Sequence, residues 1–198
     1  MKALLARLTS MVTESLEVPA EPEALMHAFC EAMSDACGRP VQLVFEAFPA
    51  EVPVSGLRLE LEDERDVIVI ERRAVPEAQL VILGHELLHV WRRDGHCGHS
   101  LSAAARGLGG EESPDVMQRA VEHVLASVDL PRSSVRAMAA RSASAAASER
   151  DAESFGLHFA REARRRMIGR YAQGAASATT RAGRIQRSLL GGLSEDLL

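Results

Sequence analysis

The stretch of residues 76–95 constrains the fold of this chain most, because it predicts one long helix directly after a run of strand-like sequence. Pro76 and Glu77 suit the first turn of a helix, and Gly95 is typical of a helix end. Between them apolar side chains recur at helical spacing: Leu80, Leu83, Leu87 and Trp91. A chain in which such a helix follows the strands in sequence is expected to form an α+β fold.

The residues before this helix predict a small sheet. Residues 41–48 and 57–70 are β-branched and alternating, and Pro49, Pro53 and Gly56 interrupt them. Residues 62–66 form a polar turn within the second stretch. We therefore expect three short strands, mostly antiparallel.

The other elements are predicted to be helical. Apolar spacing predicts helices over residues 3–16, 22–36, 114–128, 132–139 and 148–171, with a loop over residues 96–113. Residues 142–148 are rich in Ala and Ser and fit a helix start or a linker. With 198 residues, of which 46% are hydrophobic, the chain fits a single domain over residues 1–172 and a flexible tail over residues 173–198.

Charge, apolar runs and cysteine content indicate which partners and which cellular compartment suit the protein. The net charge of −5 gives no global positive field that would attract nucleic acid or an anionic membrane. Residues 1–18 lack the continuous apolar stretch of a signal peptide, and no run approaches the roughly 20 apolar residues of a membrane-spanning helix. Three cysteines do not resemble the disulfide framework of a secreted domain. These features predict a cytoplasmic protein.

The central helix contains Gly84-His85-Glu86-Leu87-Leu88-His89, a complete H-E-x-x-H motif. Residues four apart lie about 40° from one another around a helix, so both imidazoles can reach one metal ion. Glu86 projects about 60° from His89, which suits a hydrogen bond to a water on the metal better than a bond to the metal. Zinc suits two imidazoles and an oxygen ligand. The motif predicts that Glu86 is a catalytic base.

The third ligand must come from elsewhere in the chain. A metzincin site would place Gly and His three and six residues after His89, but Arg92 and Gly95 occupy those positions and His96 comes one residue late. The other template is a carboxylate on a later helix, where Glu149 and Glu153 lie four residues apart. We favour Glu149 as the ligand and Glu153 as the group that orients a ligating imidazole, with Ala152 allowing close helix approach. The alternative is that both are solvated charges.

These motifs together resemble the ImmA/IrrE-type metallopeptidases, and in particular actinobacterial proteins described as the toxin component of toxin–antitoxin systems. The resemblance rests on the H-E-x-x-H hexapeptide, on residues 95–99 and on residues 149–156, within a similarity over residues 19–163. It implies a gluzincin-like fold, zinc, Glu149 as third ligand, and cleavage of a protein partner such as a helix-turn-helix repressor or antitoxin. The spacing from His89 to Glu149 is longer than in many relatives that cleave phage repressors.

Two further features leave alternatives open. Gly95-His96-Cys97-Gly98-His99 fits transition-state donors, with His96 or His99 as the best candidates, but also a redox-sensitive cap, a second metal clamp, or simple packing against Trp91. Eight arginines face one acid between Arg161 and Arg187. That stretch fits a solvated face and tail better than a nucleic-acid contact, because few aromatic residues interleave with it.

Two function classes follow. The first is a zinc peptidase that cleaves a cognate regulator, which would pair as an added strand with an edge strand, for which residues 66–71 are the candidate. The second is a zinc-containing toxin or regulator component that acts without catalysis, by binding and sequestering a partner protein.

Overall fold

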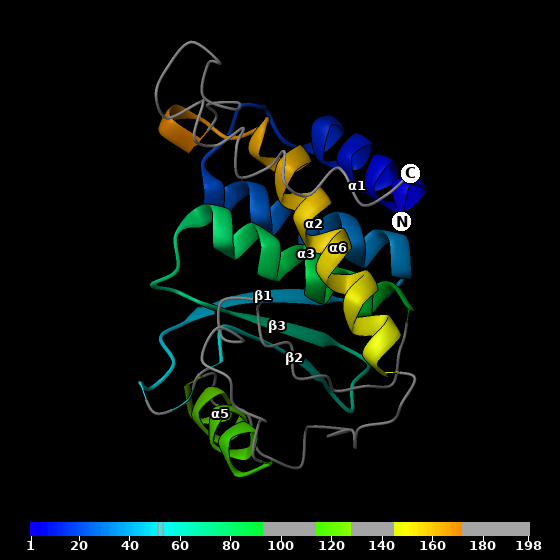
Figure 1. The fold of residues 1–198 in the computed structure, drawn as a ribbon. Coiled ribbons are helices and arrows are strands. Elements are labelled where there is room, and N and C mark those ends of the chain that lie inside the picture. Colours follow the sequence, from blue (N-terminus) through cyan, green and yellow to red (C-terminus); the bar gives the residue numbers. More distant parts are fainter. Residues whose placement is uncertain (51, 53, 93–113, 128–144, 172–198) are drawn as a thin grey trace, which may run out of the picture.

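The computed structural model describes residues 1–50, 52, 54–92, 114–127 and 145–171 (Figure 1). Within these residues lie the α-helices α1 (Lys2–Ser15), α2 (Pro22–Cys37), α3 (Pro76–Arg92), α5 (Pro114–Ser127) and α6 (Ala145–Arg164), and a 3₁₀ turn, Gly169–Tyr171. The loop expected over residues 96–113, the helix expected over residues 132–139 and the tail lie outside the described residues. The described part is therefore α+β, as the sequence predicts.

Local signals account for the helix ends. Pro22 occupies the first turn of α2, and Gly38 ends that helix in the left-handed conformation with φ 69°. Helix α3 begins at Pro76 as expected. Helix α6 begins at Ala145, so the Ala/Ser stretch of residues 142–148 is helical over its described part.

The sheet is small and mixed. Its strands are β1 (Val41–Glu46), β2 (Gly56–Glu60) and β3 (Asp66–Glu71), in the order β1-β3-β2. Strands β2 and β3 pair antiparallel, whereas β1 and β3 pair parallel from Val41 opposite Asp66 to Glu46 opposite Glu71. The expectation of a mostly antiparallel sheet is therefore wrong. Alternating sequence is compatible with either direction, and here β2 reverses into β3 through a short turn while β1 joins the other edge of β3.

Strand β3 is the central strand, so the expectation that residues 66–71 form an edge is also wrong. Its residues are bonded to β1 on one side and to β2 on the other. Five of its six residues are buried, as is usual for a strand covered on both faces. In the described part of the chain, the outer strands are β1 and β2.

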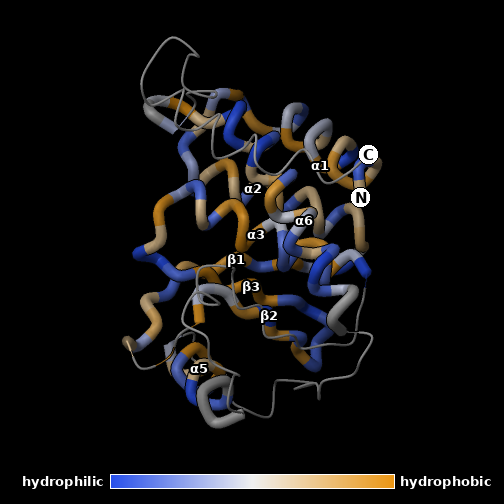
Figure 2. The backbone as a smooth tube through the Cα atoms, in the orientation of Figure 1, coloured by the Kyte–Doolittle hydropathy of each residue, from blue (hydrophilic) through white to orange (hydrophobic). Residues whose placement is uncertain are grey.

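The two faces of the sheet build two cores, because successive side chains of a strand point to opposite faces. Ile68 and Ile70 of β3 lie in a core with helices α1, α2, α3 and α6, whereas Val67 and Val69 lie in a second core with β2 and α5. The helices accordingly lie on both sides of the sheet (Figure 1), and apolar residues are frequent in the strands (Figure 2). Helix α3 lies directly over the sheet, between the strands and the amino-terminal helices.

A buried charge cluster joins one end of the sheet to α3. Asp66 is fully buried and contacts Arg58 at 2.7 Å and Arg39 at 2.8 Å. Arg39 also donates a hydrogen bond to the carbonyl oxygen of Val90, next to His89 on α3. Burial raises the pKa of Asp66, and the two guanidinium groups partly offset that rise. The cluster fixes the last turn of α3 against the strands.

None of the described helices has both the length and the apolarity that a membrane-spanning helix needs.

Candidate metal centre

Helices α3 and α6 pack antiparallel, which brings the first described turns of α6 to the carboxyl-terminal half of α3. Two ion pairs mark the two ends of this arrangement. Arg164 lies 3.9 Å from Glu77, where α3 begins and α6 ends, and Arg92 lies 2.7 Å from Asp151, where α3 ends and α6 begins. Residues near Glu149 therefore lie opposite His85 and His89, although some 60 residues separate them in sequence.

Two glycines allow the helices to approach this closely. A Cβ atom at Gly156 would lie 2.5 Å from the carbonyl oxygen of Val81 and 3.2 Å from the backbone nitrogen of His85. A Cβ atom at Gly84 would lie 2.7 Å from the Cβ of Phe159. Ala152, one turn before Gly156, is fully buried, as expected for a small residue at the contact. The helix contact itself therefore depends on the absence of side chains at Gly84 and Gly156.

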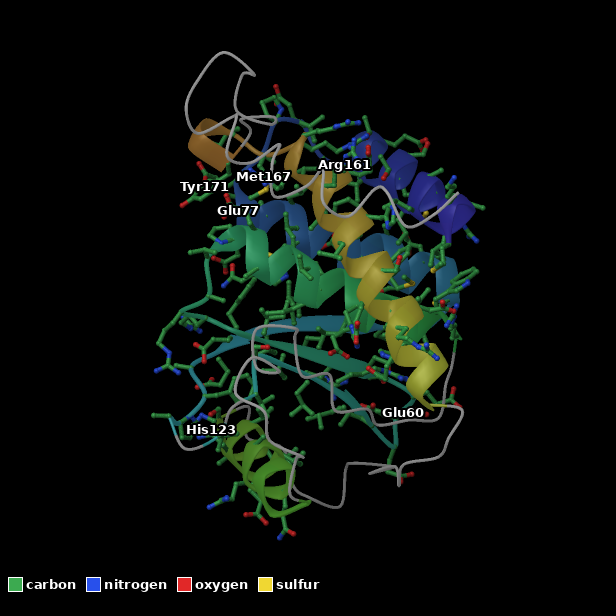
Figure 3. The ribbon with its side chains drawn as sticks, in the orientation of Figure 1. Glu60, Glu77, His123, Arg161, Met167 and Tyr171 are labelled. Carbon is green, nitrogen blue, oxygen red and sulfur yellow. The ribbon has the colours of Figure 1, made fainter. Side chains whose placement is uncertain are left out.

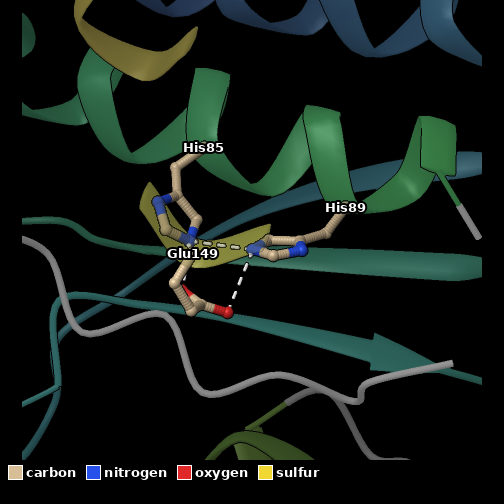
Figure 4. Close-up of side chains that lie close together, drawn as sticks. All are labelled: His85, His89 and Glu149. Carbon is tan, nitrogen blue, oxygen red and sulfur yellow. Dashed lines mark hydrogen bonds and ion pairs between the residues drawn. The ribbon is translucent and has the colours of Figure 1, made fainter. Parts of the chain in front are cut away.

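His85, His89 and Glu149 come together at this contact (Figure 4). The Nε2 atoms of His85 and His89 are 3.0 Å apart. The Glu149 carboxylate lies 3.3 Å from the first of them and 3.4 Å from the second. The two imidazoles are almost fully buried, at 4% and 1% exposed, whereas the Glu149 side chain is 29% exposed.

The spacing of these donors fits a single metal ion. A tetrahedral ion with bonds of about 2.0–2.1 Å holds its donor atoms about 3.3 Å apart. The three separations, from 3.0 to 3.4 Å, match that value before any ion is considered. In neutral form the two facing Nε2 atoms can share only one proton, so their arrangement suits a cation between them. Two nitrogens and one carboxylate oxygen are a donor set that zinc accepts.

The charge of Glu149 also suits a metal ligand. Burial disfavours its ionisation, but its contacts with the His85 and His89 rings outweigh burial and lower its pKa to about 2. The group is therefore a carboxylate at neutral pH, the form that binds metal.

Glu86 is fully buried on α3, between the two histidines in sequence. Its position relative to the sheet follows from Gly56, the first residue of β2. A Cβ atom at Gly56 would lie 3.6 Å from Oε1 of Glu86 and would collide with Ile82. The Glu86 carboxylate therefore points toward the amino-terminal end of the outer strand β2.

Of the other site residues named from sequence, only Glu153 lies among the described residues. Glu153 is half-buried one turn beyond Glu149, and among the described residues the metal-binding group contains His85, His89 and Glu149 without it. The role of Glu153 in orienting an imidazole stays a prediction. His96, Cys97 and His99 lie outside the described residues, so their roles are untested.

Sequence reasoning missed two features that position the site, the crossing at Gly156 and the Arg92–Asp151 ion pair. A glycine in the middle of a strongly amphipathic helix was the available signal for the first, because glycine costs helix stability unless close packing requires it. The ion pair has no sequence signal, since its partners lie 59 residues apart.

Comparison with models of known protein families, with curated proteins and with solved structures finds no match for this chain.

Proposed function

We propose that this protein is a zinc-dependent peptidase of gluzincin type, with His85, His89 and Glu149 as ligands and Glu86 as catalytic base. One observation supports this most: the three donors from two helices lie within 4.8 Å of one another, beside the buried Glu of an H-E-x-x-H motif. The H-E-x-x-H motif in the sequence and the convergence of three donors in space are independent observations, and both support the proposal.

The residues divide the work of peptide hydrolysis. Zinc at this site would supply a Lewis acid that polarises a peptide carbonyl and makes water nucleophilic at neutral pH. Glu86 accepts the proton of the attacking water and passes it to the leaving amine nitrogen. Arg92 and Asp151 hold the ends of the two ligand-bearing helices together.

The outer strand β2 is the best candidate for substrate pairing. It lies at the edge of the described sheet, and its first residue, Gly56, approaches Glu86. An extended peptide added along β2 would present its backbone to the Glu86 side of α3. β2 therefore replaces residues 66–71 in this role. The family resemblance suggests a helix-turn-helix regulator or antitoxin as the substrate.

The burial of the histidines supports a second candidate function. Imidazoles that are only 4% and 1% exposed would also suit a closed, structural metal centre. In that case the metal would hold α6 on α3, and the protein would act by sequestering its partner without cutting it.

Replacing Glu86 with Gln separates the two candidates, because it keeps the size of the side chain and removes the base. We expect cleavage of the helix-turn-helix product of a neighbouring gene to slow about 100-fold or more, with bound zinc unchanged. Glu77→Gln, on the first turn of the same helix, is the matched control and should cleave at the native rate. Equal cleavage by both variants would contradict the role of Glu86. Stable binding without cleavage by the native protein would favour sequestration.

A further inference from the structure

The outward side of α6 carries an unusual set of exposed residues. Among the side chains of residues 148–166, five are exposed: Arg150, Leu157, His158, Arg161 and Arg165. On a helical wheel these positions fall within about 100°, so they form one stripe. From Arg150 to Arg165 the stripe extends about 22 Å. Arg161 lies in its carboxyl-terminal half (Figure 3).

Three acidic residues of α6 offset little of the positive charge of Arg161 and Arg165. Glu149 contacts the two histidines of the metal centre, and Asp151 pairs with Arg92 at 2.7 Å. Glu162 pairs with Arg165 at 3.2 Å, but both side chains are exposed enough that water screens the pair. The stripe is thus a local positive surface on a chain whose net charge is −5.

An apolar side chain stands in the middle of the stripe. Leu157 is 63% exposed, two turns after Arg150 and one turn before Arg161. A leucine that protrudes between arginines gains nothing from a phosphate backbone, whereas a protein surface can cover it and bring carboxylates to both sides. This arrangement favours a protein partner over nucleic acid.

We propose that the stripe Arg150, Leu157, His158, Arg161 and Arg165 is a docking surface for an acidic, amphipathic segment of a partner protein. An apolar residue of that segment covers Leu157, and acidic residues lie about 6 Å and 10 Å away along α6, opposite Arg161 and Arg150. The stripe faces away from Gly156 and Phe159, which pack on α3 and Gly84. A segment bound there leaves the metal centre in place, so this surface is independent of the proposed peptidase activity.

The experiment uses the full chain and a fluorescein-labelled amphipathic helical peptide of Leu and Glu, read by fluorescence anisotropy. Arg161→Glu combined with Arg165→Glu should weaken binding about 10-fold or more, because like charges then face each other. Leu157→Ala should weaken it about 3- to 10-fold through lost apolar burial. The matched control, Lys2→Glu with Arg7→Glu on α1, changes the same charge at exposed positions elsewhere and should have less than about a 2-fold effect.

Three outcomes would overturn the proposal. One is equal binding by the α6 double variant, the Leu157 variant and the α1 control. Another is tighter binding of a Leu and Lys peptide, or of a 20-base-pair DNA duplex, than of the acidic peptide. The third is concentration-dependent self-association in sedimentation that the α6 double variant abolishes, since exposed Glu23, Glu31 and Asp35 on α2 would then supply the acidic partner from a second copy. The Glu86→Gln variant should bind the acidic peptide like the native chain, which separates this test from the peptidase proposal.

Discussion

Replacing Gly156 with alanine is expected to disturb the candidate metal centre more than the fold. The added Cβ would lie 2.5 Å from the carbonyl oxygen of Val81, where ordinary contacts begin near 3.4 Å. The backbones of α3 and α6 must therefore separate by about 0.9 Å at this point. Glu149 lies seven residues earlier on nearly the same face of α6, so a rigid displacement of the helix would move its carboxylate by a similar distance.

The expected free energies and displacements show that zinc affinity should change more than the stability of the fold. Overpacking of this kind costs about 1–3 kcal/mol, and alanine in place of glycine returns up to about 1 kcal/mol of helix propensity. The net loss of stability is therefore about 0–3 kcal/mol. Metal–ligand bonds tolerate about 0.2 Å, far less than the displacement expected at Glu149. We expect zinc affinity to fall about 10-fold or more.

The assay is a competition titration of the metal-free chain against a chromophoric zinc chelator, with thermal unfolding measured without metal. Ser154→Ala is the matched control, because it adds helix propensity at a half-buried position of the same helix that is not at the glycine contact. If Gly156→Ala and Ser154→Ala bind zinc equally tightly and unfold alike, the close crossing does not set the geometry of the site.

Three further outcomes are expected. Glu149→Ala should lose most of its bound zinc, whereas Glu153→Ala should weaken zinc affinity only about 10- to 100-fold; elemental analysis and the same titration give the order, and the reverse order would move the ligand one turn along α6. Asp66→Asn should cost about 3–5 kcal/mol in urea unfolding, because it leaves buried Arg39 without its carboxylate and buried Arg58 with only the longer contact to Glu60 at 3.4 Å, and a loss under about 1 kcal/mol would contradict that role. Cys30, whose pKa is raised by burial and secondarily by the nearby Glu31 carboxylate, should react with thiol reagents only after unfolding, whereas the partly exposed Cys37 should react in the native protein; peptide mapping of the labelled protein would show it.

Local patterns in the sequence were sufficient to predict the helices and part of the candidate site. Both limits of α2 and the start of α3 follow from Pro22, Gly38 and Pro76, since proline and glycine act on the backbone next to them. The pairing of His85 with His89 follows from the helical period alone. In each case the interacting residues lie within about one turn of helix, so no knowledge of distant contacts is needed.

The tertiary structure decided what depends on residues far apart in the chain. Alternating sequence does not state a strand's neighbours, so the parallel pairing of β1 with β3 and the central place of β3 emerged only from packing on both faces of the sheet. The sequence offered both Glu149 and Glu153, with Glu149 favoured as the ligand, and the crossing at Gly84 and Gly156 brings Glu149 to the histidines. The sequence by itself determined which side chains can bind a metal, and the helix contact determined which of them meet, because the third donor comes from a different helix.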